Sequence, residues 1–397
     1  MTRVTEGINA APVTAWLADH VEGVHPPFTF ELISGGRSNL TFAVTDAAGR
    51  RLVLRRPPMS HVLPTAHDMG REYRIISALR PTPVPVATAL GYCDDEAVNE
   101  RPFYVMDFVD GFILRGAADG EAALDERTRR VAGEDLVDVL AAIHHVDVDA
   151  VGLGNLARRD GYIERQLRRW HGQFQQSQQQ AREIGVYRPV PLVDEVHRLL
   201  AERVPPQHGT AIVHGDYRID NTVISAEGRI QAVLDWELCT LGDALADVGT
   251  LLAYWSDHAV AEMAGPPPDA KQAAPEFGAT EPGATQPGAT QPGATQLGAT
   301  ESGATGQLAA TALPGFPGRA EVADRYAARS GRDLTQLGFY VAFAYWKLAC
   351  ILEGVFVRYA AHAMSDDRSA ADALAPGVED RARRALEALQ GSPADKV

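Results

Sequence analysis

The spacing of apolar residues changes once along this chain, and that change limits the folds open to it. Between residues 28 and 104, apolar and polar residues alternate in the short runs FTFELI, LTFAVTD and RLVLRR, as in strands with one buried face. A helical stretch at residues 67–79 interrupts the strands, which resume around Gly91 and over residues 103–109. From about residue 125 the apolar residues recur at helical spacing. We therefore predict an α+β fold with two lobes, a β-rich N-lobe ordered β-β-β-α-β-β and a mostly helical C-lobe.

The same patterns predict where the parts of the chain begin and end. We assign residues 1–110 to the N-lobe, residues 111–264 to the first part of the C-lobe and residues 314–397 to its closing helices. Helices are predicted from about residue 125 and over residues 162–170, 245–255, 321–329, 337–363 and 380–389, around one small β-hairpin.

Residues 278–306 are a pentapeptide repeat, GATEP, GATQP, GATQP, GATQL, GATES and GATG. A five-residue period matches neither a solenoid unit nor a coiled-coil heptad, and this composition cannot bury a core. We predict that residues 265–313 are a disordered low-complexity insertion, with PGFPGR at residue 314 as the return to packed structure. A passive linker is the favoured interpretation, and a partner-binding segment is the alternative.

Composition excludes several classes of function. With 37 basic and 52 acidic residues the formal charge is −15, which disfavours nucleic acid and anionic membrane surfaces as partners. Three widely spaced cysteines suit a reducing compartment, and with no apolar run of signal-peptide length near residue 1 we expect a cytoplasmic protein. The most apolar stretch, residues 337–357, contains Lys347 and Glu353, so we expect a buried core helix rather than a membrane span.

A cluster of polar residues lies in the predicted hairpin, VHGDYRIDN from Val213 and AVLDWE from Ala232. We expect Asp216 at the tip of a loop, where its carboxylate can reach a substrate hydroxyl. Asn221 and Asp235 fall beside each other across the hairpin and offer the oxygen ligands that Mg²⁺ prefers when it holds polyphosphate oxygens. The alternative is ordinary turn chemistry, in which Asp and Asn bond their own backbone. The order and spacing of all three residues favour the site.

These motifs resemble those of the aminoglycoside phosphotransferase and choline kinase superfamily, which has the protein-kinase-like fold. The resemblance runs from about residue 28 to residue 237 and resumes in the last helices. It implies that Asp216 is the catalytic residue, that Asn221 and Asp235 bind Mg²⁺, and that His214 braces the loop. ATP is the implied phosphoryl donor.

The resemblance also implies a nucleotide site in the N-lobe. In SGGRSN at residues 34–39, the backbone at Gly35, Gly36 and Ser38 is expected to approach phosphates. Arg55 stands where the family carries a phosphate-binding lysine, and Glu72 is the helix carboxylate expected to pair with it. A shift of one residue would put Arg56 in this role, but strand alternation favours Arg55.

One hinge segment and two further residues take their expected roles from the family. FYVMDFVDG resembles the hinge between the lobes, so the backbone of Asp107, Phe108 and Val109 is expected to receive adenine. Asp247 is expected to hold the catalytic loop through hydrogen bonds. Glu237, in the D-W-E motif, is expected near the catalytic base.

The resemblance implies a small-molecule acceptor that carries a hydroxyl group, and its class stays open between two alternatives. An aminoglycoside or amino alcohol suits an acidic protein. The motifs resemble even more the kinase domains fused to acyl-CoA dehydrogenases, which implies a hydroxyacyl-CoA and a separate acyl-CoA-metabolising enzyme as a candidate partner. Aromatic residues considered for the pocket are Trp236, Trp255, Tyr340 and Trp346, and residues considered for the CoA phosphates are Arg158, Arg159, Arg165, Arg168 and Arg169.

The sequence therefore predicts an ATP- and Mg²⁺-dependent phosphotransferase that acts on an alcohol group. The rival from another class is a nucleotide-binding pseudokinase or scaffold, because the usual lysine is missing and the insertion is large. A protein kinase fits less well, because no activation-segment APE follows Asp235. The sequence does not define the oligomeric state or the preference between ATP and GTP.

Overall fold

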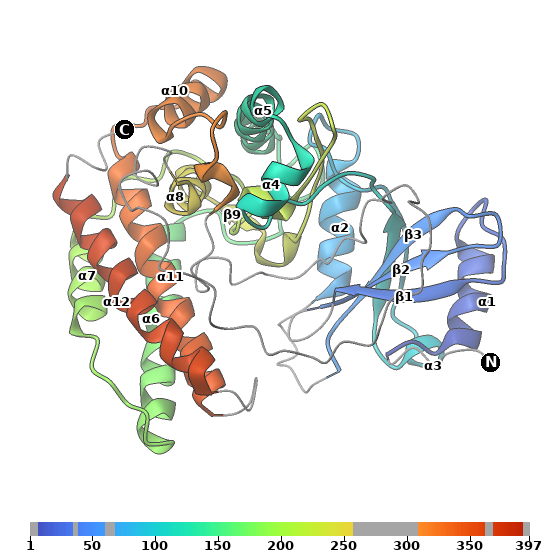
Figure 1. Ribbon diagram of the computed structural model, residues 1–397, viewed down its shortest axis with the longest axis horizontal. Coiled ribbons are helices and arrows are strands. Elements are labelled where there is room, and N and C mark those ends of the chain that lie inside the picture. Colours follow the sequence, from blue (N-terminus) through green and yellow to red (C-terminus); the bar gives the residue numbers. More distant parts are fainter. Residues whose placement is uncertain (1–6, 35–38, 60–67, 257–308, 362–367, 392–397) are drawn as a thin grey trace, which may run out of the picture.

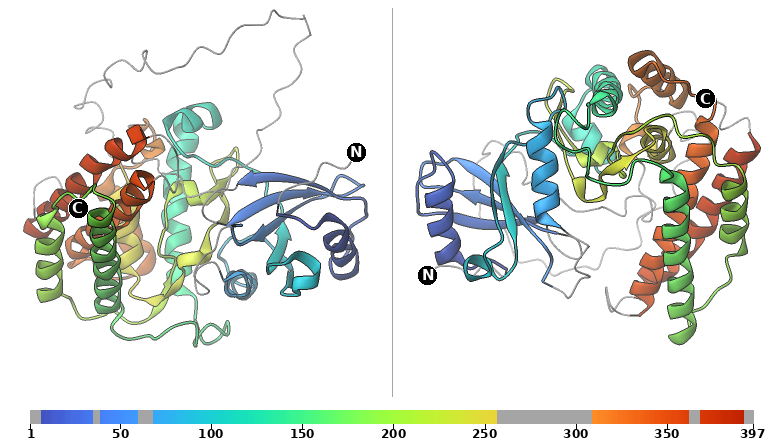
Figure 2. Two further views of the ribbon diagram at one scale, coloured as in Figure 1. Left: turned by 90° about the horizontal axis from the view of Figure 1, so that it is seen from below. Right: turned by 180° about the vertical axis from the view of Figure 1, so that it is seen from behind.

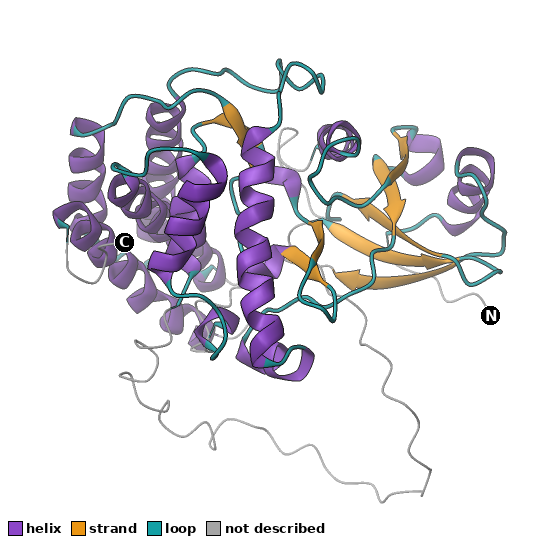
Figure 3. Cartoon of the chain, turned by 90° about the horizontal axis from the view of Figure 1, so that it is seen from above, coloured by secondary structure: helices purple, strands orange, loops and turns teal. Residues whose placement is uncertain are grey.

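The computed structural model describes residues 7–34, 39–59, 68–256, 309–361 and 368–391. The five-stranded sheet lies in one lobe and most of the helices lie in the other (Figure 3), so the predicted α+β, two-lobed architecture is confirmed. Gly35, Gly36 and Ser38 lie outside the described residues, as does the whole pentapeptide repeat.

The N-lobe is built on one antiparallel sheet of five strands in the order β1-β2-β3-β5-β4 (Figure 1). Their bounds are β1 Thr29–Ser34, β2 Leu40–Thr45, β3 Arg51–Arg56, β4 Ala89–Cys93 and β5 Phe103–Asp107. Each of the five lies where a strand was predicted. Two helices in this lobe, α1 (Ala10–His20) and the short α3 (Glu96–Asn99), were not predicted.

Alternation along β3 assigns its side chains to opposite faces of the sheet. Leu52 and Leu54 pack with α1 on the outer face, whereas Val53 packs with α2 (Met69–Leu79) on the inner face. Because side chains in a strand alternate, Arg55 lies on the same face as Val53. This face is turned toward the C-lobe (Figure 1).

The C-lobe is a set of helices packed around α11 (Leu337–Ala360), which contacts α6, α7, α8 and α12. The other helices are α4 Ala117–Ala123, α5 Glu126–His145, α6 Tyr162–Glu183, α7 Pro191–Glu202, α8 Leu245–Tyr254, α10 Arg319–Ser330 and α12 Arg368–Gln390. Helices α4 and α7 were not predicted, and α6 and α12 extend well beyond their predicted bounds. Figure 2 shows the two lobes side by side from two further directions.

The predicted hairpin is confirmed: β7 (Thr222–Ile224) pairs with β8 (Ile230–Val233), which brings Asn221 beside Asp235. The pairing of β6 (Ala211–Val213) with β9 (Thr240–Gly242) was not predicted. Two ladders therefore meet at the loop that leaves β6. Strand β9 is too short to show a period in the sequence.

Helix α11 is long and apolar enough to span a membrane by length and composition alone. In the structure, 83% of its most apolar 18-residue stretch is buried inside the protein. A helix buried in this way is an ordinary core helix of a globular lobe, as the presence of Lys347 and Glu353 predicted.

The ends of the segment that joins α8 to α10 lie close together. The backbone N–H of Ser256 donates to Oγ1 of Thr311 over 3.1 Å. The short 3₁₀ turn η4 (Ala310–Ala312) is packed structure that lies a few residues before the predicted position at Pro314. Ala310, Thr311, Ala312 and Leu313 are all buried.

Helix α8 crosses α11 at a glycine, and this contact gives a test of the packing. A Cβ placed on Gly249 would lie 2.3 Å from the backbone oxygen of Tyr340, whereas one on Gly172 in α6 would meet nothing within 4 Å. We expect Gly249→Ala to lower the free energy of unfolding by about 1–3 kcal/mol, because the two helices must separate. Gly172→Ala, the control, is expected to raise it by about 0.5–1 kcal/mol. Urea titration measures both, and equal effects would contradict the packing.

Candidate active site

The loop that leaves β6 is fixed by one buried carboxylate. Asp247, in the first turn of α8, accepts the backbone N–H of His214 over 2.6 Å and that of Gly215 over 2.8 Å. His144 Nε2 lies 3.3 Å from the same carboxylate, and its Nδ1 lies 2.7 Å from the hydroxyl of Tyr326. Burial raises the pKa of Asp247, but the bonds from His144 and the backbone outweigh it, so the pKa lies below its usual range.

Gly215 makes the sharp turn that carries the chain from β6 to Asp216. Its φ is +87°, and a Cβ there would lie 2.9 Å from the backbone oxygen of Leu238. Both facts require glycine at this position. The glycine of the HGD motif therefore sets the direction in which Asp216 leaves the strand.

His214 connects this loop to the segment that ends in Asp235. Its Nε2 lies 2.8 Å from the backbone oxygen of Leu234, and its Nδ1 accepts the backbone N–H of Asp216 over 3.3 Å. A carbonyl accepts and an N–H donates, so the imidazole hydrogen belongs on Nε2. His214 is completely buried and is positioned to hold the loop, not to contact a substrate.

The carboxylate of Asp216 is held by two side chains from its own loop. Asn221 Nδ2 donates to Oδ2 of Asp216 over 3.0 Å and to its backbone oxygen over 2.8 Å. Arg218 Nε donates to the same Oδ2 over 3.3 Å, and its Nη1 pairs with Asp220 over 2.9 Å. Burial raises the pKa of Asp216, but Arg218, Lys347, His214 and Asn221 together lower it below its usual range. Asp216 is thus an ionised acceptor of hydrogen bonds.

Asn221 and Asp235 lie at the adjoining ends of β7 and β8. The backbone N–H of Leu234 donates to the backbone oxygen of Asn221 over 2.8 Å, and Asp235 follows directly after this bond. Asp235 has φ +62°, a left-handed conformation that Asp tolerates better than most residues. Both contacts of the Asn221 amide with Asp216 use Nδ2, so Oδ1 is the atom left for a cation.

The chemistry of this pair fits a magnesium ion. One amide oxygen and one carboxylate are too few for an all-protein cage, and no cluster of three or more His, Cys, Asp or Glu side chains that could hold a metal is found among the described residues. Mg²⁺ commonly takes one or two protein ligands and completes its shell with phosphate oxygens and water. Asn221 and Asp235 therefore suit a metal that arrives with a nucleotide.

Arg55 links the N-lobe to this pair. Its Nε lies 3.3 Å from Oε2 of Glu72, and its Nη2 lies 2.5 Å from Oδ1 of Asp235. Arg55 and Glu72 are both buried, so their contact is not a surface ion pair. Arg56 points away, with its guanidinium on the backbone oxygens of Gly7 and Pro57, which leaves Arg55 as the residue that faces the site. The contact of Arg55 with Asp235 was not predicted from the sequence.

Glu72 is a buried carboxyl group with a raised pKa. It accepts hydrogen bonds from the Tyr104 hydroxyl over 3.1 Å and from Asn39 Nδ2 over 3.0 Å. Burial raises the pKa of Glu72 to about 7, because the Arg55 guanidinium compensates only in part and Asp235 and Glu237 add negative charge. Asn39 also lies 3.4 Å from Oε2 of Glu237, which places Glu237 at the meeting point of the two lobes.

The predicted hinge lies at the end of β5, where the chain passes to the C-lobe. The backbone N–H groups of Asp107 and Phe108 donate to Thr88 and Arg51 oxygens over 2.9 and 3.4 Å. Since these two N–H groups already have partners, the groups that stay as predicted adenine contacts are the N–H of Val109 and the carbonyl groups of the segment. Just beyond it, Phe112 exchanges two 2.8 Å backbone hydrogen bonds with Ile224, which ties the hinge to the strand after Asn221.

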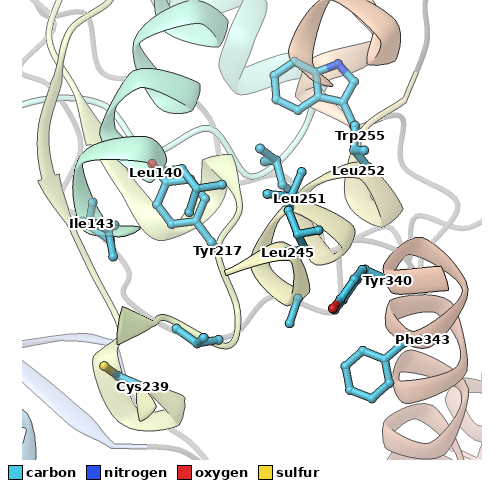
Figure 4. Close-up of a cluster of buried hydrophobic side chains, with 14 of the residues drawn as sticks. Leu140, Ile143, Tyr217, Cys239, Leu245, Leu251, Leu252, Trp255, Tyr340 and Phe343 are labelled. Atoms are coloured by element: carbon cyan, nitrogen blue, oxygen red, sulfur yellow. The ribbon is translucent and has the colours of Figure 1, made fainter. Parts of the chain in front are cut away.

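The aromatic residues considered for the acceptor pocket are core residues. Trp236, Trp255, Tyr340 and Trp346 are at most 3% exposed. The ring N–H groups of the three tryptophans donate to backbone oxygens of Val233, Pro317 and Val193. Figure 4 shows Trp255 and Tyr340 within a cluster of buried apolar side chains. Helical spacing in the sequence could not separate core from pocket, and in the structure these side chains are packed inside the lobe.

The arginines of the basic stretch around α6 differ in their surroundings: some are bonded within the protein and others face solvent. Arg159 pairs with Asp149, and Arg165 donates to the backbone oxygens of Asp160 and Arg158. The side chains of Arg158, Arg168 and Arg169 are exposed. Three of the five arginines are therefore exposed, and the other two are engaged in the contacts given above.

Two side chains next to Asp216 were missed as site residues. Arg218 belongs to the motif, but its spacing suggested no role; it is 5% exposed and lies over the Tyr254 ring at 4.8 Å. Lys347 comes from α11, far along the sequence, and its Nζ donates to the backbone oxygen of Gly215 over 2.6 Å. The signal for Lys347 was a lysine inside an apolar helix, which was interpreted only as evidence against a membrane span.

The comparisons with known proteins agree with this geometry. The model of the "Phosphotransferase enzyme family" matches residues 29–279. Acyl-CoA dehydrogenase family member 10 of Mus musculus is 35% identical over 59% of this chain, and member 11 of Gallus gallus is 36% identical over 56%. This chain spans only 21% and 28% of the length of these two curated relatives.

Solved structures match nearly the whole chain. A Ralstonia eutropha protein named as a candidate aminoglycoside phosphotransferase is 29% identical, with a TM-score of 0.70 over 96% of this chain and 98% of its own. A mutant of the aminoglycoside phosphotransferase APH(4)-Ia, solved with AMP-PNP and hygromycin B, has a TM-score of 0.54 at 15% identity, over 94% of this chain and 99% of its own. The fold is therefore the protein-kinase-like fold.

The raised pKa of Glu72 predicts how stability depends on pH. Folding raises this pKa from its ordinary value of 4.5 to about 7, so the folded protein binds the extra proton, and its stability falls as pH rises through this window. We expect the free energy of unfolding of the ligand-free protein to lose on the order of 2–3 kcal/mol from this group between about pH 5 and pH 8. Glu72→Gln removes that part of the pH dependence.

The measurement is urea unfolding at several pH values for the protein and two variants. Glu121→Gln, which changes an exposed glutamate on α4, serves as the control and keeps the pH dependence of the unmodified protein. Identical pH profiles for Glu72→Gln and the unmodified protein would show that the Glu72 carboxyl is ordinary.

Proposed function

The chain belongs to the phosphotransferase enzyme family, and from that premise we propose that it transfers the γ-phosphoryl group of ATP to a hydroxyl group of a small molecule. The observation that carries the proposal is the meeting of Asp216, Asn221 and Asp235 with the Arg55–Glu72 pair of the other lobe. Phosphoryl transfer needs little covalent chemistry from a protein, because positioning and charge stabilisation supply most of the catalysis.

Each residue has a defined task in this reaction. Asp216, held by Asn221 and Arg218, accepts a hydrogen bond from the acceptor hydroxyl, orients its oxygen toward the γ-phosphorus and takes its proton as transfer proceeds. Asn221 and Asp235 would hold Mg²⁺, which when bound neutralises charge on the phosphate oxygens. Arg55, kept in place by Glu72, supplies a buried cation for the nucleotide phosphates.

The charges beside Asp216 favour one class of acceptor. Arg218 and Lys347 are both buried cations close to this carboxylate, and each lowers its pKa. They would repel a protonated amine next to the reacting hydroxyl, such as aminoglycosides and amino alcohols carry. A hydroxyacyl-CoA is neutral near its hydroxyl, and its phosphates suit the exposed arginines Arg158, Arg168 and Arg169.

The named relatives support the same choice, since two of them are acyl-CoA dehydrogenase family members 10 and 11. We therefore propose hydroxyacyl-CoA as the acceptor class, with aminoglycosides and amino alcohols as the second candidate. A separate acyl-CoA-metabolising enzyme is the corresponding partner. The experiment that tests this is incubation of the protein with Mg-ATP and each class of alcohol, with the phosphorylated product identified by mass.

The rival function is that of a pseudokinase or scaffold that binds nucleotide without turnover. Its motivation was arginine in place of lysine, and the geometry of Arg55 weakens that motivation. Arg55 makes the same kind of contact with the helix glutamate that the lysine was expected to make. Mg-ATP binding without transfer to any alcohol in the panel would favour the rival.

Replacing the base separates binding from chemistry. Asp216→Asn keeps the size of the side chain but removes the charge that accepts the proton. We expect transfer to fall by about 10²–10⁴-fold, the contribution typical of a general base, while the affinity for Mg-ATP changes little. Turnover with the identified acceptor and equilibrium nucleotide binding are measured in parallel. Undiminished transfer would exclude Asp216 as the base.

Replacing the carboxylate on the metal side tests the predicted ligand. Asp235→Asn lowers the negative charge at the proposed magnesium position, so we expect the Mg²⁺ concentration for half-maximal ATP binding to rise about tenfold or more. Titration of Mg²⁺ against a fluorescent ATP analogue measures the effect. Asp94→Asn, at an exposed N-lobe carboxylate, is the control and keeps the original Mg²⁺ requirement. An unchanged requirement in Asp235→Asn would assign the metal to other residues.

A further inference from the structure

The chain uses lysine very rarely, and this makes one lysine conspicuous. It contains 34 arginines and three lysines, Lys271, Lys347 and Lys396. Lys271 and Lys396 fall outside the described residues, so Lys347 is the one lysine in the described part of the chain. It lies in the middle of α11 and is 7% exposed. A buried ammonium is costly unless its surroundings compensate it, so its contacts need a physical reason.

The contacts of Lys347 all lead to the loop that carries Asp216 or to one aromatic ring. Its Nζ donates to the backbone oxygen of Gly215 over 2.6 Å and lies 5.4 Å from the centre of the Trp170 ring. The carboxylates that act on its charge are Asp216 and Asp247, and the exposed Arg169 opposes them. The ammonium is therefore held by the Gly215 backbone oxygen and the face of the Trp170 ring. Its positive charge is balanced by the carboxylates of Asp216 and Asp247.

The Gly215–Asp216 peptide is consequently held at both ends. Its oxygen accepts the Lys347 ammonium, and its N–H donates to Nδ1 of His214 over 3.3 Å. The φ of Gly215 is +87°, and in this turn its backbone oxygen faces the Lys347 ammonium of α11. Rotation of the peptide would break both contacts and would swing the Asp216 side chain away from Asn221 and Arg218.

We propose that Lys347 is a positioning residue for the reaction, which fixes the Gly215–Asp216 peptide from the C-terminal helices and so sets the direction of the Asp216 carboxylate. The inference rests on the proposed function, because the reaction is what requires Asp216 to be aimed. It adds a residue that lies beyond residue 279, where the match to the family model ends.

The form of the side chain supports this role. Arginine presents a broad planar fork, whereas lysine presents a compact ammonium on a narrow stem. A single carbonyl oxygen is a matched acceptor for the ammonium, while the fork is shaped for two acceptors. Burial lowers the pKa of Lys347, but Asp216 and Asp247 oppose that effect.

The same helix provides a matched comparison. Glu353 is a second buried charge in α11, but it bonds with Gln178 and Arg188, each over 2.6 Å, and both of these partners lie outside the catalytic loop. Replacing Glu353 removes a buried charge from α11 as replacing Lys347 does. A role of Lys347 in helix packing alone would therefore make the two variants behave alike.

The test uses the full-length protein with Mg-ATP and water as the acceptor, and compares Lys347→Met with Glu353→Gln. We expect Lys347→Met to lower the kcat of ATP hydrolysis by about 10- to 100-fold, the effect of a misaimed reacting group, and to keep KM for ATP within about threefold. Amide hydrogen exchange is expected to accelerate at residues 213–218 and not across α6. Glu353→Gln is expected to keep kcat, KM and the exchange of that loop.

Lys347→Met with the kcat and loop exchange of the unmodified protein would overturn the proposal, and so would equal changes in both variants. If Lys347→Met does not fold, a resonance experiment on the unmodified protein tests the proposal instead. With ¹⁵N-labelled lysine, the Lys347 ammonium is expected to exchange slowly and to show a through-space contact with the Gly215 α-hydrogens, and a fast-exchanging ammonium without it would overturn the proposal. If the unmodified protein neither hydrolyses ATP nor transfers phosphate, that result contradicts the proposed function instead. Amide hydrogen exchange and the lysine resonance then still test whether Lys347 holds the Gly215–Asp216 peptide.

Discussion

The carboxylate of Asp247 is the constraint on which the site depends. It lies fully buried at the start of α8 and accepts two consecutive backbone N–H groups of the catalytic loop. A buried ion survives only when hydrogen bonds replace its water, and here the loop itself supplies them. The loop and the helical lobe therefore cannot separate without leaving the charge uncompensated. His144 and Tyr326 extend the same bonding outward to α5 and α10.

The charges of the two lobes are complementary where they meet. Arg55 comes from the N-lobe sheet and contacts both its helix partner Glu72 and Asp235 of the C-lobe. In the ligand-free protein this arginine serves as the counterion of the predicted metal ligand. Binding of the nucleotide and its metal must therefore break the ion pair between Arg55 and Asp235. Part of the binding free energy is used for this rearrangement of charge.

The fold was predictable where the chemistry is local. Alternation in the N-lobe strands and helical spacing in α5, α8 and α11 are set by which side chains are buried, and these elements lie where they were predicted. Helix α7 was not predicted, and neither was strand β9, because β9 is short and its pairing with β6 is set by tertiary packing. For the site, the motif brought Asp216, Asn221 and Asp235 to attention, whereas Lys347 and the contact of Arg55 with Asp235 join residues far apart in the sequence. Periodicity carries no information about such pairs.

The bond between Ser256 and Thr311 has a consequence for engineering. Since Ser256 and Thr311 lie side by side, any flexible segment that joins two such points closes a loop whose entropic cost grows only with the logarithm of its length, about 0.6 kcal/mol for each doubling. The junction is thus a suitable insertion site for a second domain. A fluorescent reporter or an affinity tag could replace residues 257–308 while both anchoring ends keep their places in the fold.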